Sequence, residues 1–307
     1  MTDWTYVGSN RWERPPPCSR AHSQYDCLAC RLISSRISAD RLGEGTHDMT
    51  RRAVVTGASM GIGRAIAEAL LRDGWTVLGV SRTYPKGGMP GDFRWLHADL
   101  STGYCLEHLA LSIPDGRLDA LVHCAAEQGP IGPLVPYGRR LTVDEIHAWH
   151  TTIRTNLIST YDVVRLCLPA LRQSEDGRIV LFAGGGAFTA RPYASTYAAS
   201  KAGVVSLMET LAAEEERVTV NAVSPGYVPT PMTGHPDGPS PEKDRAVACV
   251  LYLLSPATRG LSGKTISAEY DTWEAISQEN VESINDSLLG ERHRYLLKIP
   301  TREPVSV

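Results

Sequence analysis

A tyrosine and a lysine four residues apart, Tyr197 and Lys201, have the types and spacing needed for proton transfer. Residues at this spacing lie on the same side of a helix, one turn apart. An ammonium beside a phenol favours the phenolate, so we expect Lys201 to lower the pKa of Tyr197 from about 10 toward working pH. The phenol could then donate a proton to a carbonyl oxygen, or accept one from an alcohol. A pair at this spacing often occurs by chance, so its meaning depends on the elements around it.

A glycine-rich segment at 56–63 lies between an expected strand at 52–56 and an expected helix that follows Gly61. Glycines there allow a tight turn and the close approach of a pyrophosphate, to which the start of the helix offers free N–H groups and the positive end of its dipole. The spacing G-x-x-x-G-x-G differs from the usual G-x-G-x-x-G, but its position directly after the opening strand indicates a dinucleotide site. The residues expected to contact the cofactor here are Gly57, Ser59, Met60, Gly61, Ile62 and Gly63.

The end of the second expected strand, at 76–80, bears on the choice between NAD and NADP. An Asp or Glu there would bond the ribose hydroxyls of NAD and repel a 2′-phosphate. The chain has Ser81 and Arg82 instead, and a guanidinium matches a phosphate with paired hydrogen bonds. We therefore expect NADP in preference to NAD, with Ser81 adding a hydroxyl; the alternative is that Arg82 is a solvated loop residue. Asp99 and Leu100, after the third strand, are placed to bracket the adenine, although an Asp there could equally cap a helix.

The elements that position these residues begin near residue 51, where short apolar strands start to alternate with helical segments. Strands joined by helices imply parallel pairing and right-handed crossovers. We therefore predict an α/β fold, a doubly wound Rossmann-type sheet of about seven parallel strands with helices on both faces, in a single domain at 50–273. The expected strands lie at 52–56, 76–80, 94–97, 118–123, 178–182, 218–223 and 265–268, and the helical segments include 142–172 and 197–215.

The two ends of the chain differ from this domain in character. Residues 1–49 are rich in Arg, Ser and Pro and show no sustained period, so we expect a flexible extension or a coding start misplaced from Met49. Four soft ligands in this stretch are enough in number for zinc, but their spacing matches no zinc-finger pattern, so no metal is expected. Residues 274–307 form a polar tail that could cover the substrate cleft or an oligomer interface. The four soft ligands are Cys18, His22, Cys27 and Cys30.

The bulk composition excludes several function classes. A net charge of −3 gives no reason to expect nucleic acid or an anionic membrane as partner. No apolar run is long enough to span a membrane, and the N-terminus lacks the pattern of a secretory signal. The seven cysteines are odd in number, and several are scattered singly through apolar segments, which is typical of reduced cysteine in a cytoplasmic protein.

These ordered motifs together resemble the classical short-chain dehydrogenase/reductase family over roughly residues 50–272. The resemblance implies that 56–63 is the cofactor loop, Asp99 the adenine-contact acid, Asn156 a structural and proton-relay residue, and Tyr197 with Lys201 the catalytic pair. It also implies a nicotinamide cofactor, a small carbonyl or alcohol substrate, and a homodimer or homotetramer.

The segment 221–230 resembles the family's loop that holds the nicotinamide end. By that likeness Val228 would bond the carboxamide through its backbone, and Thr230 would lie near the pyrophosphate. The remaining residues expected at the cofactor are Cys124, Ala125, Ala126, Pro225 and Gly226, together with the catalytic pair Tyr197 and Lys201.

Two departures from the family pattern stand out. The fourth strand ends at His123 and Cys124, where the family has two asparagines; His123 could face the cleft, but a histidine bonded to backbone is the favoured interpretation. The family's serine lies 13 residues before the tyrosine, and that position here is Gly184, with no serine or threonine from 183 to 188. We hypothesise that backbone N–H groups of the glycine run, or a substrate hydroxyl, replace it; Thr189 and Ser195 are alternative donors.

Three functional interpretations follow. The leading one is an NADP-dependent oxidoreductase that moves a hydride between nicotinamide and a small carbonyl or alcohol. A non-catalytic NADP-binding subunit or sensor would explain the missing serine, but retention of Tyr197, Lys201 and Asn156 counts against it. A non-redox lyase or epimerase would use bound nicotinamide transiently, and would turn over substrate without net cofactor consumption.

Overall fold

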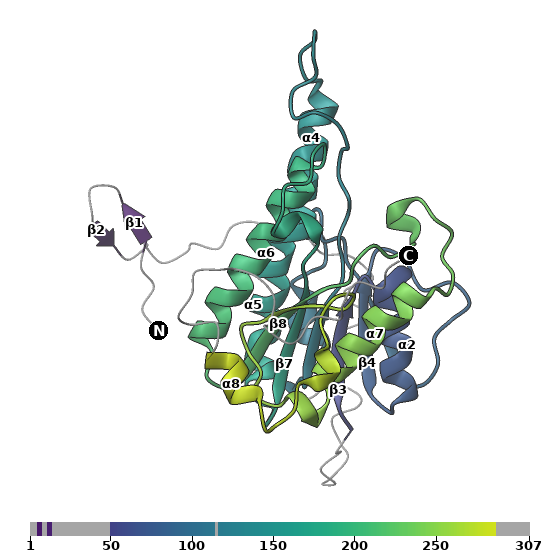
Figure 1. Cartoon of the computed structure of the whole chain (residues 1–307), viewed down its shortest axis with the longest axis vertical. Coiled ribbons are helices and arrows are strands. Elements are labelled where there is room, and N and C mark those ends of the chain that lie inside the picture. Colours follow the sequence, from purple (N-terminus) through teal and green to yellow (C-terminus); the bar gives the residue numbers. More distant parts are fainter. Residues whose placement is uncertain (1–4, 8–10, 14–49, 114–115, 287–307) are drawn as a thin grey trace, which may run out of the picture. The chain divides into compact units, whose positions relative to one another are not determined.

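The computed structural model of the chain describes residues 5–7, 11–13, 50–113 and 116–286 (Figure 1). The chain divides into two units, Met1–Met49 and Thr50–Val307, which are described separately.

In the first unit, strands β1 (Thr5–Val7) and β2 (Arg11–Glu13) pair antiparallel, with Tyr6 opposite Trp12. The sequence shows no strand period here, and a pair of three-residue strands is too short to produce one. The candidate zinc ligands, Cys18, His22, Cys27 and Cys30, lie outside the described residues. The expectation that they hold no metal therefore stays a prediction.

Within the second unit, a parallel sheet of seven strands confirms the predicted α/β fold. Its order is β5-β4-β3-β6-β7-β8-β9, and every pairing is parallel. The inner strands are aliphatic and buried along their length, as expected of a parallel sheet covered on both faces. The strands are β3 (Arg52–Thr56), β4 (Thr76–Ser81), β5 (Phe93–His97), β6 (Ala120–His123), β7 (Gly177–Phe182), β8 (Val218–Ser224) and β9 (Thr265–Ser267).

Helices α5 (Ser159–Leu171) and α6 (Ser195–Glu214) pack on one face of this sheet, and α2 (Gly61–Arg72) and α7 (Pro241–Leu253) on the other (Figure 1). Each pair closes a separate hydrophobic core. Val54 belongs to the first core and its neighbours on β3 to the second, because successive strand residues point to opposite faces.

Shorter helices complete the domain. Helix α4 (Val143–Ile153) continues through a π-helical turn, η2 (Arg154–Ile158), into α5, and projects away from the sheet (Figure 1). The sequence predicted one continuous helix at 142–172 and did not foresee the π turn. The other helical segments are α3 (His108–Ser112), η3 (Gly185–Ala187), η4 (Pro231–Thr233), η5 (Pro256–Thr258), η6 (Trp273–Ala275) and α8 (Val281–Asp286).

Residues beyond 273, where the sequence predicted a polar tail, contribute to the core. Ile276 is fully buried and Val281 is nearly so, and both belong to the core under α7. Two isolated apolar residues in a polar stretch carry no period, so the sequence could not reveal this packing.

The sheet order creates a crevice at one place. From β3 the chain runs outward to β4 and β5, and then returns to the other side of β3 to form β6. The loops that leave β3 and β6 therefore diverge at their carboxyl ends, and ligands of open α/β sheets bind at such a point. The chemistry is thus expected beside Thr56 and His123, which are paired in register at these two strand ends.

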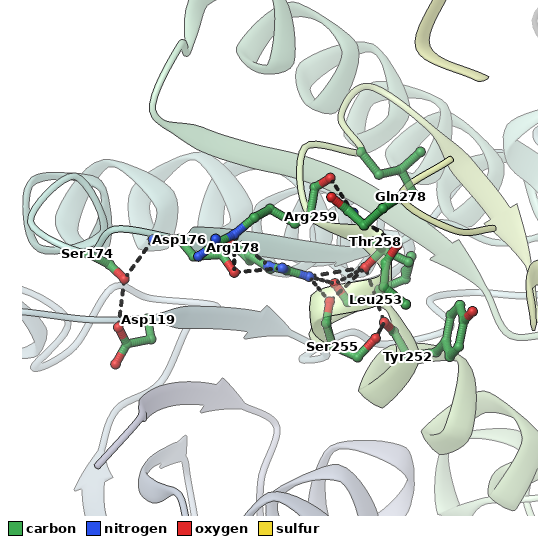
Figure 2. A network of polar contacts seen from close by, with 12 residues as sticks. Asp119, Ser174, Asp176, Arg178, Tyr252, Leu253, Ser255, Thr258, Arg259 and Gln278 are labelled. Carbon is green, nitrogen blue, oxygen red and sulfur yellow. Dashed lines mark hydrogen bonds and ion pairs between the residues drawn. The ribbon is translucent and has the colours of Figure 1, made fainter. Parts of the chain in front are cut away.

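The opposite end of the sheet holds a buried arginine that ties α7 to β7 (Figure 2). Arg178 donates from Nε and Nη2 to the carboxylate of Asp176, at 3.0 and 2.6 Å. Its Nη1 donates to the carbonyls of Leu253 and Ser255, at 2.8 and 2.6 Å, and to the hydroxyl of Thr258. These carbonyls end α7, so the guanidinium satisfies acceptors that the helix itself leaves open.

Candidate cofactor cleft and active site

A cleft of about 480 Å³ opens at the switch point of the sheet, where the loops after β3 and β6 diverge. Its volume lies within the usual range for cofactor and ligand sites. It brings together most residues that the sequence singled out for a dinucleotide: Gly57, Ser59, Met60, Gly61, Ile62, Gly63, Ser81, Arg82, Asp99, Leu100, Cys124, Ala125, Ala126 and Thr230. It is also lined by residues that the sequence did not mark: Val80, Thr83, Ala98, Ser101, Glu127, Thr155, Pro231 and Met232.

The remaining expected cofactor residues, Tyr197 and Lys201 among them, lie outside this lining. Val228 is buried, and Gly226 has a positive φ of 78° and packs against the side chain of Glu269. Pro225 precedes it in the same loop. Whether these three contact a cofactor stays a prediction.

The glycine loop has no room for side chains at two positions. Gly57 has φ +68°, and a Cβ there would lie 3.1 Å from the backbone of Ala125. A Cβ on Gly63 would lie 2.5 Å from the carbonyl oxygen of Gly57. Helix α2 therefore packs directly on the loop and brings its first N–H groups to the cleft.

At the adenosine end of the cleft, Arg82 is exposed, whereas Ser81 is buried and already engaged. The Ser81 hydroxyl donates to the carbonyl of Thr83 at 2.8 Å and accepts from the indole N–H of Trp95 at 3.1 Å. Its single proton is therefore not available to a phosphate. Arg82 is the one predicted phosphate donor here whose role the geometry leaves open.

Asp99 stabilises a turn and caps no helix, and its contact with the adenine stays a prediction. It lines the cleft, and its Oδ1 accepts from the backbone N–H and the hydroxyl of Ser101, at 2.9 and 2.7 Å. The local bonds fix the turn after β5, which directs Leu100 and Asp99 to the cleft.

Tyr197 and Lys201 lie in the first turns of α6, as predicted, and both are buried. The Lys201 ammonium donates to the carbonyl of Phe182 at 2.8 Å and lies 5.8 Å from the centre of the Tyr197 ring. Burial lowers the pKa of Lys201 to about 8.

The expected lowering of the Tyr197 pKa by Lys201 is wrong for this structure. Burial raises the pKa of Tyr197, because a phenolate loses its hydration there, and the cation that opposes this is Arg191. The guanidinium carbon of Arg191 lies 5.3 Å from the centre of the Tyr197 ring. Sequence reasoning missed Arg191, since a single arginine in a loop carries no distinguishing pattern.

Asn156 lies in the π-helical turn and connects two elements of the site. Its Oδ1 accepts from the N–H of Glu127 at 2.8 Å, and its Nδ2 donates to the carbonyl of Glu127 and to the hydroxyl of Ser200, at 2.9 and 3.0 Å. Ser200 in turn donates to the Tyr197 carbonyl at 2.8 Å. Asn156 thus holds the chain after β6 against the turn of α6 that carries Tyr197 and Lys201. The π turn, which places an asparagine at such a junction, is a feature often found at functional sites.

Gly184 faces the tyrosine hydroxyl directly. A Cβ at Gly184 would lie 2.7 Å from the Tyr197 oxygen and 3.1 Å from the ring. The phenol therefore occupies the space that a side chain at this position would need. Thr189, which the sequence offered as an alternative donor, gives its proton to the Gly185 carbonyl at 3.0 Å, and Ser195 is the first residue of α6.

His123 has a structural role, although its partner differs from the expected backbone group. It is 3% exposed, and its Nδ1 lies 3.0 Å from the hydroxyl of Thr56. That hydroxyl accepts from the N–H of Ala125 at 3.1 Å, so its proton points to Nδ1. Burial lowers the pKa of His123 to about 3, which keeps the ring neutral. The bonds join the ends of β3 and β6 and hold Ala125, which lines the cleft.

The described residues lack two further features. No group of three or more His, Cys, Asp or Glu side chains in this part of the chain is arranged to hold a metal ion. None of its helices is both long and apolar enough to cross a bilayer.

Comparison with known proteins places the fold and the cleft in a family. A family model described as short chain dehydrogenase matches residues 51–237. The chain is 33% identical over 195 residues to the D-beta-hydroxybutyrate dehydrogenase of Rhizobium meliloti, which covers 60% of this chain and 74% of that enzyme. It is 28% identical over 236 residues to the 3-oxoacyl-(acyl-carrier-protein) reductase FabG of Vibrio harveyi, covering 70% of this chain and 93% of that enzyme.

Among solved structures, a short chain dehydrogenase from Shigella flexneri 2a complexed with NADP superposes with a TM-score of 0.60. The two chains are 26% identical, and the match covers 73% of this chain and all of that one. The family match extends over more than half of the chain, from β3 to the segment after β8. The protein belongs to the short-chain dehydrogenase family, a family of oxidoreductases with a Rossmann-like nucleotide-binding fold.

Proposed function

We propose that this protein is an NADP-dependent oxidoreductase that transfers a hydride between nicotinamide and a small carbonyl or alcohol, with Tyr197 as the general acid and base. The observation that carries the proposal is the cleft at the switch point, which the glycine loop, Arg82, Asp99 and Thr230 line together. Family membership supports a nicotinamide dinucleotide as cofactor.

The residues present fit such a cofactor. The loop is closed to side chains at Gly57 and Gly63, which leaves main-chain N–H groups facing the cleft. Asp99 and Leu100 would hold the adenine, and Thr230 would lie beside the pyrophosphate. When bound, the nicotinamide supplies or accepts the hydride.

The chain's own residues supply the proton chemistry. In reduction, the Tyr197 hydroxyl donates its proton to the carbonyl oxygen; in oxidation, the phenolate accepts the proton of the alcohol. Lys201 and Asn156 support this step by fixing the first turns of α6, through the carbonyl of Phe182 and the hydroxyl of Ser200. Burial of Tyr197 keeps bulk water away from the proton in transit.

The preference for NADP rests on Arg82, the exposed cation at the adenosine end, and on the lack of an acid at the end of β4. The NADP complex of the Shigella relative is consistent with it. Replacement of the family's serine by Gly184 is part of the same proposal: backbone N–H groups of the glycine run, or a hydroxyl of the substrate, hold the substrate oxygen instead.

The names of the relatives suggest where to look for the substrate. They include a D-beta-hydroxybutyrate dehydrogenase, a 3-oxoacyl reductase and an acetoacetyl-CoA reductase. We propose 3-oxo and 3-hydroxy acyl compounds as the first substrates to test. Assembly as a homodimer or homotetramer in the cytoplasm stays a prediction.

The proposal is tested by following nicotinamide absorbance with a panel of carbonyl compounds. We expect turnover with NADPH that falls by a factor of about 10²–10⁴ in Tyr197→Phe. Tyr161→Phe, which alters an exposed tyrosine on α5, is the matched control and should keep wild-type turnover. Full activity in Tyr197→Phe would show that the assigned acid is wrong.

The same experiment separates the two other functions. NADP binding without turnover of any substrate in the panel would favour a non-catalytic subunit or sensor. Product formation without net cofactor consumption would favour a lyase or epimerase.

A further inference from the structure

The amino end of helix α2 carries a carboxylate from a distant part of the chain. The N–H of Gly61, the first residue of α2, donates to Oδ2 of Asp237 at 3.0 Å, across 176 positions of sequence. Met60, the residue before the helix, provides no side-chain cap. Asp237 therefore satisfies a donor that the cofactor loop itself leaves open.

A buried lysine holds this carboxylate in place. Lys243, 5% exposed, donates from Nζ to Oδ1 of Asp237 at 2.8 Å and to the carbonyl of Gly238 at 2.6 Å. Burial would raise the pKa of Asp237, but the hydrogen bonds from Lys243 and Gly61 outweigh it and hold that pKa below its ordinary value. At neutral pH the group on the helix end is thus an anion.

The segment that carries Asp237 also borders the cleft. Thr230, Pro231 and Met232 line it, and the Thr230 methyl group lies 3.5 Å from the position of a Cβ on Gly61. The stretch from 230 to 243 therefore approaches Gly61 twice, through Thr230 at the cleft wall and through the hydrogen bond to Asp237.

A carboxylate and a phosphate compete for the same feature of a helix. Free N–H groups and the positive end of the dipole attract either anion, and two anions at one helix end repel each other. In a cleft built for a dinucleotide, the diphosphate needs this end of α2. Asp237 holds it in this structure.

We propose that Asp237 is an internal competitor of the cofactor's diphosphate, and that binding of the cofactor displaces it from Gly61. This inference rests on the proposed function, because it requires a dinucleotide in this cleft. Lys243 is paired with Asp237 and is buried, so leaving its ammonium alone would be unfavourable and the two are expected to move together. Cofactor binding is thereby coupled to the segment 231–243, which runs from the cleft wall into the first turn of α7.

The test compares the affinities of three ligands for Asp237→Ala and for wild-type protein, by isothermal titration calorimetry. We expect Asp237→Ala to bind NADP and inorganic pyrophosphate about three to ten times more tightly, since a competing anion has been removed. Adenosine, which carries no phosphate, should bind both proteins equally. Asp237→Asn keeps the shape of the side chain and should give the same direction of change.

The matched control is Asp244→Ala. Asp244 is an exposed acid in the first turn of α7, one residue from Lys243, so its loss changes the net charge equally without touching Gly61. It should leave all three affinities unchanged within twofold.

The outcomes separate this inference from the proposed function. If wild-type protein binds NADP and the affinity of Asp237→Ala and Asp237→Asn is unchanged or weaker, the competition is refuted. An equal gain in affinity for adenosine, or for NADP in Asp244→Ala, also refutes it, because the effect would not depend on the helix end. Absence of NADP and NAD binding by every protein overturns the proposed function itself.

Discussion

At the scale of single residues, the centre of the site is the contact between Tyr197 and Gly184. The tyrosine oxygen lies against the backbone of Gly184, in the volume where a side chain would begin. The glycine at this position leaves that volume to the phenol. It lets the phenol approach the end of β7 more closely than a serine would allow.

Gly184→Ala should therefore destabilise the protein. Its Cβ would lie 2.7 Å from the Tyr197 oxygen, and overpacking of this kind costs about 1–3 kcal/mol. The neighbouring Gly185 provides the control, because a Cβ there meets nothing within 4 Å. Urea denaturation should show a loss of stability in Gly184→Ala and none in Gly185→Ala. Equal stabilities of the two variants would mean that Tyr197 can move away from the added Cβ without a loss of folding free energy. Gly184→Ser should behave like Gly184→Ala and not restore a more active enzyme.

Arg191 gives a second prediction, on pH dependence. Burial raises the pKa of Tyr197 and the Arg191 charge lowers it. Oxidation of an alcohol requires the phenolate, so kcat/KM in that direction increases as pH rises toward this pKa. Arg191→Met removes the opposing charge, raises the pKa of Tyr197 further and should shift the oxidation profile to higher pH.

The measurement is kcat/KM for alcohol oxidation from pH 7 to 10.5. Arg191→Lys keeps the charge and should retain most of the wild-type profile. A change in KM with no shift of the profile would indicate that Arg191 acts on the substrate and not on Tyr197.

At the scale of elements, one end of the sheet forms the cleft and the other end holds contacts that stabilise the fold. The carboxyl ends of the strands form the cleft, and the amino end of β7 is fastened to α7 through Arg178 (Figure 2). Lys243, which binds Asp237, lies in the first turn of α7, and Arg178 binds the carbonyl of the last residue of that helix. The Arg178 network is therefore separated from the cofactor loop by the length of α7.

Arg178→Met should reduce stability and leave the site intact. The side chain donates to a carboxylate and to two helix-terminal carbonyls while 4% exposed, and bonds to charged groups of this kind contribute about 1.5–3 kcal/mol. Arg259 is the control, since its side chain is 60% exposed and its Nε lies 3.5 Å from Oδ2 of the same Asp176. Arg259→Met should cost less than about 1 kcal/mol. Chemical denaturation measures both, and a loss of NADP affinity in Arg178→Met would contradict the separation of the two ends.

At the scale of the whole molecule, the predictable features are those determined by residues that lie close together in the sequence. The parallel strands and the glycine loop were predictable from short apolar segments and from the residues between 56 and 63, whereas the order of the strands in the sheet was not predicted. The positions of Tyr197 and Lys201 in the first turns of α6 follow for the same reason.

Features that depend on contacts or burial without a sequence pattern were not predictable. Asp237 meets Gly61 across 176 residues, and Arg191 reaches the Tyr197 ring from a loop without a pattern. The pKa of Tyr197 changes in the direction opposite to that expected, because the sequence shows its neighbour Lys201 but not the depth at which both are buried.

The π turn that carries Asn156 also determines how helix α4 is oriented about its axis. Such a turn inserts one residue into a helix, and each residue of an α-helix rotates the chain by about 100°. The direction in which the projecting helix α4 presents its side chains is therefore set by the single extra residue that brings Asn156 to Glu127 and Ser200. Restoring a regular helix here would rotate α4 about its axis and expose a different set of its side chains. The π turn therefore determines both the geometry of the site and the surface that α4 presents.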